Sequence, residues 1–293
     1  MILNRLNTKL LAFVLLFSVA CHSDYPTYEG PNYIMFAQES YTLGILDSEE
    51  WFEIPISATR PMDSDRNIGV EIIDSESNAI ESYHYLLEAS TLRIAAGELT
   101  TAVRIKGIPE NIKSNEALSI KLRLVLDEAD EWDIYGTETE VNLQKCCPIN
   151  MEAFTGYCKL TSSWLMQYLN TDSRLVRTRL STTEQNTIII EDMFYDGYDI
   201  KLHFNTDDRL NPTIDYDAQV AGLTGEAFGT IYGNGKLMMA SPLGYTSYYG
   251  TCENFAVQYA MLYVEEVGTV GVYVNIFEWI TDDEAERILR EGF

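Results

Sequence analysis

Three tyrosines lie in a short glycine-bounded segment, GYTSYYG, at residues 244–250. A tyrosine ring offers a flat apolar face that can stack on a sugar ring, and its hydroxyl group can form a hydrogen bond. We therefore take Tyr245, Tyr248 and Tyr249 as candidate ligand-binding residues.

A second candidate platform consists of Trp132 and Tyr135, in the polar stretch that runs from Asp130 to Gly136. The competing interpretation for both clusters is structural. Aromatic residues pack in cross-strand pairs in many sheets, and a ring buried in this way contacts no ligand.

Common catalytic motifs are missing from the sequence, which has no GxSxG segment, no HExxH segment and no P-loop. Two carboxylates can hydrolyse a glycosidic bond, but with 45 acidic residues chance pairs are unavoidable. His203 falls in a predicted strand, so we interpret it as a structural imidazole. We expect no enzyme and no cofactor, and a hydrolase would require a carboxylate pair facing a cleft.

The segment DSDRN at residues 63–67, with Asp74 further on, has oxygen ligands at alternate positions as calcium loops do. Ile68 stands where such a loop needs a glycine, so we expect an acidic turn instead. The cysteines and the three histidines lack the spacing of a zinc site, and no metal is expected.

Four cysteines follow residue 21, namely Cys146, Cys147, Cys158 and Cys252. An exported chain can oxidise them, whereas the adjacent pair is too strained to bond to itself. We expect Cys252 to form a disulfide with Cys158 or with one of the two adjacent cysteines.

The N-terminus has the pattern of a secretion signal, with Arg5 and Lys9 ahead of an apolar run that is too short to span a bilayer. The ending SVAC at residues 18–21 resembles the lipobox of bacterial lipoproteins, with Ser18 where leucine is most familiar. Looser lipoboxes of this kind are similar to those of Bacteroidetes surface lipoproteins.

That resemblance implies cleavage of residues 1–20, acylation of Cys21 by fatty acids such as palmitate, and anchoring to the outer membrane facing the cell surface. The alternative is an ordinary secretion signal or an uncleaved anchor. Residues 21–32 contain two prolines and a glycine and read as a tether.

The formal net charge of -25 disfavours nucleic-acid binding, which depends on basic residues that neutralise phosphates. Anionic lipid head groups would also repel so negative a chain, so the lipid anchor is its expected contact with the membrane. An aromatic content of 12% predicts a folded chain rather than an acidic disordered one.

Residues 33–145 contain about seven short strand patterns, which predict an antiparallel β-sandwich. The clearest is Leu118 to Leu126, where leucine or isoleucine alternates with other residues. Residues 78–126 resemble immunoglobulin-like domains of the Calx-beta type, through Tyr83, Tyr85, the Gly97-Glu98 turn and the long alternating strand. Calcium-binding members have paired aspartates after the second strand; GIPE at residues 107–110 stands there, so calcium binding does not carry over.

Residues 149–293 are again strand-rich and predict an antiparallel meander or barrel with a short C-terminal helix at residues 281–291. The dipeptides Asp196-Gly197 and Asn234-Gly235 suggest tight hairpins, and residues 255–264 and 270–279 read as long strands. The expected fold class is thus all-β, with two domains.

Together these features predict a cell-surface lipoprotein that binds a glycan or a surface partner without catalysis. The alternative is a structural or adhesive subunit that pairs its sheets with another surface protein.

Overall fold

The computed structural model describes residues 28–46, 49–132 and 136–291. The predicted signal peptide, the predicted acylation site Cys21, the first part of the predicted tether and Tyr135 lie outside the described residues. Within the described part of the chain, no helix is long and apolar enough to cross a membrane.

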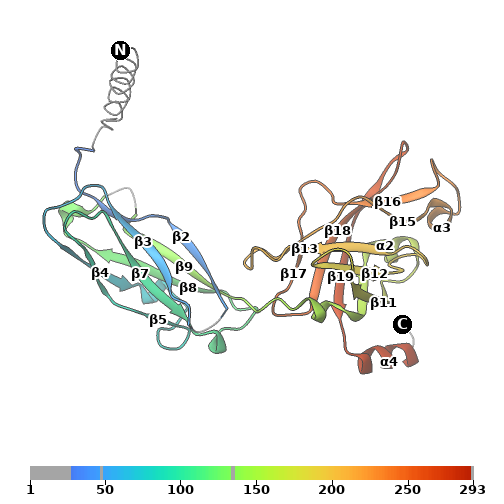
Figure 1. Ribbon diagram of the computed structural model, residues 1–293, viewed down its shortest axis with the longest axis horizontal. Coiled ribbons are helices and arrows are strands. Elements are labelled where there is room, and N and C mark those ends of the chain that lie inside the picture. The colour runs from blue at the N-terminus through green and yellow to red at the C-terminus, as the bar shows by residue number, and fades with distance from the viewer. Residues whose placement is uncertain (1–27, 47–48, 133–135, 292–293) are drawn as a thin grey trace, which may run out of the picture.

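The first half of the chain forms a sandwich of two sheets, seen in blue to green in Figure 1. Its strands are β1 (Ile34–Phe36), β2 (Ser40–Ile45), β3 (Phe52–Ala58), β4 (Arg66–Ile72), β5 (Tyr85–Leu87), β6 (Thr91–Ile94), β7 (Thr100–Gly107), β8 (Leu118–Val125) and β9 (Glu138–Lys145). One sheet has the order β1-β3-β7-β5 and the other the order β2-β9-β8-β4-β6. The β2–β9 pairing is parallel and the other ladders are antiparallel.

The alternation read from the sequence explains how the sandwich packs. In β8, Leu118, Ile120, Leu122 and Leu124 are buried, whereas Arg123 on the opposite face pairs with Glu71 and Glu138. Side chains of successive strand residues point to opposite faces, so this pattern gives one face to the core.

The segment at residues 63–67 is a structural turn that leads into β4. Asp65 accepts a hydrogen bond from the Ala96 amide through Oδ1 and pairs with Arg93 through Oδ2, each at 2.9 Å. Both oxygens of this carboxylate are therefore used within the sandwich.

The second half forms an antiparallel barrel, coloured yellow to red in Figure 1. Its strands are β10 (Gly156–Ser162), β11 (Ser173–Leu180), β12 (Thr187–Glu191), β13 (Ile200–Phe204), β14 (Thr213–Asp215), β15 (Gln219–Leu223), β16 (Lys236–Ala240), β17 (Ser247–Tyr249), β18 (Phe255–Val264) and β19 (Gly268–Trp279). The α-helices are α2 (Ser163–Tyr168), α3 (Thr224–Phe228) and α4 (Asp282–Glu291). Short 3₁₀ turns lie at η1 (Asp74–Glu76), η2 (Pro109–Asn111), η3 (Glu128–Asp130) and η4 (Met151–Phe154).

Strand β18 closes the barrel. The sheet runs β18-β17-β14-β13-β12-β11-β10-β19, and β19 pairs back with β18. The first part of β18 pairs with β17, and its later part pairs with β16 on the same side, so the β15–β16 hairpin extends away from the barrel wall. The predicted fold class, a β-sandwich followed by an antiparallel barrel with a C-terminal helix, is confirmed.

A hydrogen-bonded group of three polar side chains lies in the otherwise largely apolar barrel interior. Ser162 Oγ lies 2.6 Å from Asn275 Oδ1, and Asn275 Nδ2 donates to Gln258 Oε1 at 3.0 Å. All three residues are buried, which is tolerable because each has a polar partner. This group fixes the register of β10, β18 and β19, to which its three members belong.

Neither predicted tight hairpin in the barrel is present in the expected form. Phe194 and Tyr195 are buried in the long connection between β12 and β13 rather than forming a strand. Ile231 and Tyr232 are exposed in the turn between α3 and β16. Aromatic residues that a loop buries are the same types that strands favour, which explains why a strand was wrongly predicted at Phe194 and Tyr195.

The disulfide joins Cys147 to Cys252, with Cα atoms 5.0 Å apart. Pairing of Cys252 with Cys158 was wrong, because Cys158 is a buried free thiol whose side chain points into the barrel from β10. Cys147 directly follows the sandwich, and Cys252 lies between β17 and β18. The bond therefore ties the start of the second half of the chain to the barrel.

Candidate ligand-binding face of the barrel

Strand parity places a group of apolar side chains on the outside of the barrel. Along β18 the even-numbered residues from Ala256 to Val264 are buried inside, so the odd-numbered residues point outward. Across the register, Tyr248 of β17 is opposite Val257, and Val257 is opposite Ile276 of β19. We call this surface the aromatic face, and its members are Tyr245, Tyr248, Phe255, Tyr259, Val272, Val274 and Ile276.

The rings of the aromatic face contact one another and stay accessible. Tyr245 packs on Tyr259 with ring centroids 5.2 Å apart, and Tyr248 meets Phe255 edge-on at 6.3 Å. The exposed fractions of Tyr245 and Tyr248 are 52% and 41%. These two predicted ligand contacts thus lie on one surface, supported from below by neighbouring rings.

Tyr249 does not belong to this surface. It is only 1% exposed, its ring packs against Phe154 and Phe204, and its hydroxyl donates to the Asn205 carbonyl at 3.0 Å. Adjacent residues in a strand face opposite sides, so Tyr248 and Tyr249 cannot both point outward. The predicted grouping of Tyr249 with Tyr245 and Tyr248 as stacking residues is therefore corrected, because its ring packs the barrel interior.

The second predicted platform lies in the sandwich and is separate from the aromatic face. Trp132 stacks on Tyr33 with ring centroids 5.4 Å apart and an angle of 10° between the planes. Tyr135 lies outside the described residues. The Trp132 ring is thus already covered on one side by Tyr33.

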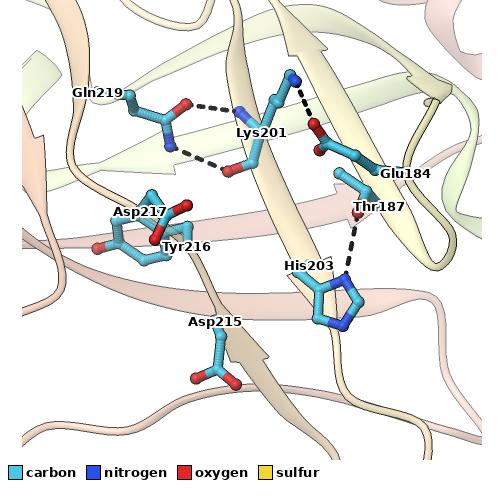
Figure 2. A pocket seen from close by; sticks show the side chains of 8 residues that line it. All are labelled: Glu184, Thr187, Lys201, His203, Asp215, Tyr216, Asp217 and Gln219. Atoms are coloured by element: carbon cyan, nitrogen blue, oxygen red, sulfur yellow. Dashed lines mark hydrogen bonds and ion pairs between the residues drawn. The ribbon is translucent and has the colours of Figure 1, made fainter.

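A polar groove of about 440 Å³ runs along the outside of the same barrel wall. Figure 2 shows the side chains that line it, which come from β12 to β15, from the β11–β12 connection and from the β14–β15 connection: Glu184, Thr187, Lys201, His203, Asp215, Tyr216, Asp217 and Gln219. Of these residues, the sequence singles out only His203. Strand alternation places Lys201 and His203 on the same outer face of β13, but it does not show which strands lie beside β13.

Hydrogen bonds hold the walls of this groove (Figure 2). The Gln219 amide accepts from the Lys201 backbone N–H at 2.9 Å and donates to its carbonyl at 3.0 Å, as a paired strand would. Lys201 Nζ pairs with Glu184 at 2.6 Å, and His203 Nδ1 lies 3.2 Å from Thr187 Oγ1. Asp215 and Asp217 add carboxylates to the groove.

The groove and the aromatic face are neighbours on one wall. His203 is opposite Asp215 in the β13–β14 ladder, and Thr213, two residues earlier in β14, is opposite Tyr248. Directly opposed residues lie about 5 Å apart, and residues two apart along a strand share a face. One outer wall therefore combines exposed rings with carboxylate, amide and imidazole groups.

Sugars have hydroxyl groups that hydrogen-bond to carboxylates and amides, and C–H faces that pack on aromatic rings. The combined wall offers both kinds of contact. Within the described residues, no three His, Cys, Asp or Glu side chains are grouped so as to hold a metal ion.

The family of the chain follows from its second half. Residues 134–291, which are 158 of 293 residues, match the model of a domain of unknown function, DUF4984. The chain belongs to the DUF4984 family. The matched range of the DUF4984 domain begins shortly before β9 and covers the barrel with α4.

No curated protein matches the DUF4984 chain. Among solved structures it is similar to the apo CBD1 domain of Calx, with 15% identity, a TM-score of 0.33, and coverage of 40% of this chain and 98% of that one. A protein of unknown function from Bacteroides ovatus has 9% identity, a TM-score of 0.36, and coverage of 84% and 89%.

A two-domain protein of unknown function from Bacteroides fragilis has 13% identity, a TM-score of 0.33, and coverage of 55% and 65%. With all three TM-scores below 0.5, neither the fold nor a function of the DUF4984 chain is inferred from these structures.

Proposed function

We propose that this chain is a surface lipoprotein that binds glycan on the outer wall of its barrel and does not catalyse a reaction. The observation that carries this proposal is the placement of the exposed Tyr245 and Tyr248 rings beside the polar groove on one wall. Stacking would contribute apolar contact, and the groove would select the arrangement of hydroxyl groups.

The lipid anchor is part of the same proposal and is supported by the SVAC sequence ending at Cys21. In this role the sandwich is a spacer. Sandwich and barrel follow each other along the long axis of the molecule (Figure 1), so the barrel would stand away from the membrane. The strongly negative net charge favours the same orientation, because anionic lipid head groups repel it.

The test is retention on a glycan array of the chain beginning at residue 21, with Cys21 replaced by serine. We expect the protein to retain a defined set of glycans and the double variant Tyr245→Ala/Tyr248→Ala to lose at least tenfold in affinity, since stacked rings are worth about 0.5–1.5 kcal/mol each beyond the area they bury. The matched control is Tyr83→Ala, which removes an equally exposed ring from the sandwich and should bind normally. Equal retention of the double variant and the parent protein would contradict the proposed site.

A second candidate function is docking of a partner protein on the same wall. It is favoured by three outward-facing aliphatic residues of β19, Val272, Val274 and Ile276, each more than a third exposed beside the tyrosine rings. Exposed apolar patches of this kind commonly mark protein interfaces. Co-purification of one stoichiometric surface protein without glycan retention would favour this alternative.

A hydrolase is distinguished in the same assay. The groove contains the carboxylates of Asp215 and Asp217, so release of reducing sugar from a retained glycan would identify hydrolysis. Our proposal predicts that retained glycans stay intact.

A further inference from the structure

A pocket of about 300 Å³ lies between the sandwich and the barrel. The sandwich contributes Ser114, Gln144 and Lys145, and the barrel contributes Arg209 and the loop that ends at Phe255. We call it the junction pocket. Its position where two domains meet is typical of ligand-binding sites.

Covalent and polar contacts hold the two sides of the junction pocket together. Cys252 is part of its wall and is bonded to Cys147, and Ser114 Oγ lies 2.8 Å from Glu253 Oε1 across the domain boundary. Beside the pocket, the buried Cys146 thiol lies 3.8 Å from the Arg209 carbonyl. The pocket is thus preformed rather than assembled by a moving loop.

The junction pocket is lined by two cationic side chains, although the chain as a whole is strongly negative. Arg209 makes no ion pair or side-chain hydrogen bond with any part of the chain that the structure describes, and Lys145 Nζ donates only to the neutral carbonyl of Pro109 at 3.0 Å. Glu253 supplies the one carboxylate among the lining residues, and it is engaged by Ser114. Two unpaired cations therefore line one pocket in a protein with a net charge of -25.

The nearest acidic neighbour in sequence does not neutralise Arg209. The Asp208 carboxylate accepts hydrogen bonds from the Leu210 and Asn211 amides and from the Asn211 side chain. These hydrogen bonds lower the pKa of Asp208, and the bond from the Asn211 side chain has the largest effect. The Asp208 carboxylate is therefore engaged within its own loop. The guanidinium group of Arg209 remains available to a ligand.

The junction pocket also touches the aromatic face. Phe255 lines the pocket, and its ring contacts that of Tyr248. Gly250 makes this arrangement possible, because a Cβ at that position would approach the Phe255 ring to 2.5 Å. A ligand that stacks on Tyr248 can therefore extend past Phe255 toward Arg209.

We propose that the junction pocket binds an anionic group, a carboxylate or a sulfate, of a glycan that stacks on the aromatic face. The guanidinium group forms paired hydrogen bonds with such planar or tetrahedral oxyanions, and Lys145 adds a second positive charge. The polar groove cannot take this role, because its lysine is already paired with Glu184 and its other charged groups are aspartates. This inference rests on the proposed glycan-binding function and narrows it to acidic glycans.

The experiment is titration calorimetry at low salt with three probes: galacturonic acid trisaccharide, galactose trisaccharide and inorganic sulfate. We expect the acidic trisaccharide to bind at least tenfold more tightly than the neutral one, and the Arg209→Gln variant to lose that difference. Binding of the acidic probe should weaken as sodium chloride is added. Measurable sulfate binding would show that the pocket accepts a free anion as well.

Two variants serve as controls. Lys236→Gln removes an exposed cation of β16 and should leave all three titrations unchanged. Arg209→Lys keeps the charge but not the paired geometry, and should recover only part of the affinity. Thermal unfolding of Arg209→Gln should match that of the parent, since the side chain is exposed.

Equal binding of the acidic probe by Arg209→Gln and the parent, or no preference of the parent for the acidic probe, would overturn the inference. If Tyr248→Ala weakens both trisaccharides while Arg209→Gln changes neither, the glycan site stands and the anion pocket falls. If Arg209→Gln abolishes sulfate binding while Tyr248→Ala affects no glycan, the pocket is supported and the aromatic site is contradicted.

Discussion

Raising the pH above 10 is expected to unfold the protein cooperatively, with the barrel affected more than the sandwich. Burial raises the pKa of Tyr249 to about 12 and raises the pKa values of Tyr195, Tyr216 and Tyr273 in the barrel. In the sandwich, burial raises that of Tyr85, with Glu81 and Asp74 adding to the effect.

The direction follows from proton linkage. A phenol with a higher pKa in the folded than in the unfolded state keeps its proton longer when folded. Its stabilising contribution is complete below the unfolded pKa of about 10 and is lost as the pH rises through the folded pKa. For Tyr249 the loss between pH 10 and about pH 12 amounts to about 2–3 kcal/mol, and the other buried phenols add to it.

The measurement is tyrosinate absorbance recorded together with circular dichroism. The buried tyrosines of the barrel, Tyr195, Tyr216, Tyr249 and Tyr273, should ionise together as the barrel unfolds. Tyr249→Phe removes one titrating group and should make the protein less sensitive to alkali. Smooth ionisation of all 19 tyrosines in a protein that stays folded would contradict the assigned burial.

Removing the disulfide should destabilise the barrel by about 2–4 kcal/mol, the usual range for a native bridge. Cys147 and Cys252 are 105 residues apart, and the closed loop contains β10 to β17. Without the bond the unfolded barrel gains conformational freedom, whereas the sandwich has no strand within that loop.

The double variant Cys147→Ser/Cys252→Ser should therefore shift the denaturant transition of the barrel and leave that of the sandwich in place. Burial raises the pKa of the neighbouring Cys146 thiol, which makes it a poor nucleophile and limits disulfide exchange. Reductant should reproduce the shift in the parent and have no further effect on the variant. If reductant leaves the denaturant transition of the parent unchanged, the disulfide does not stabilise the barrel.

Much of the fold was predictable because strand alternation is a local property. The pattern from Leu118 onward became β8, residues 255–264 became β18, and the acidic start with Arg290 at the end marked α4. Barrel closure was less predictable, because it depends on β18 pairing with three different strands. Composition did not distinguish the loop position of Phe194 and Tyr195 from a strand, because residues buried in a loop are apolar like those of a strand.

The candidate site also has parts that local sequence predicts and parts that depend on the tertiary fold. The proximity of Tyr245 and Tyr248 could be predicted from the sequence because their glycine-bounded segment is local, but strand alternation places Tyr249 on the opposite side from Tyr248. The polar groove was missed because its residues come from four strands and their connections, which only the closed sheet brings together. The choice of Cys147 as the partner of Cys252 likewise depends on how the two domains meet.

Hydrogen exchange measured by mass spectrometry, with and without the glycan from the array that binds most tightly, locates the bound ligand on the protein. We expect slower exchange in residues 244–259, which hold β17 and the start of β18, and in the neighbouring β14, with no change in β5 of the sandwich. Protection confined to the sandwich, or to the far side of the barrel around β11, would contradict the placement of the ligand on this wall.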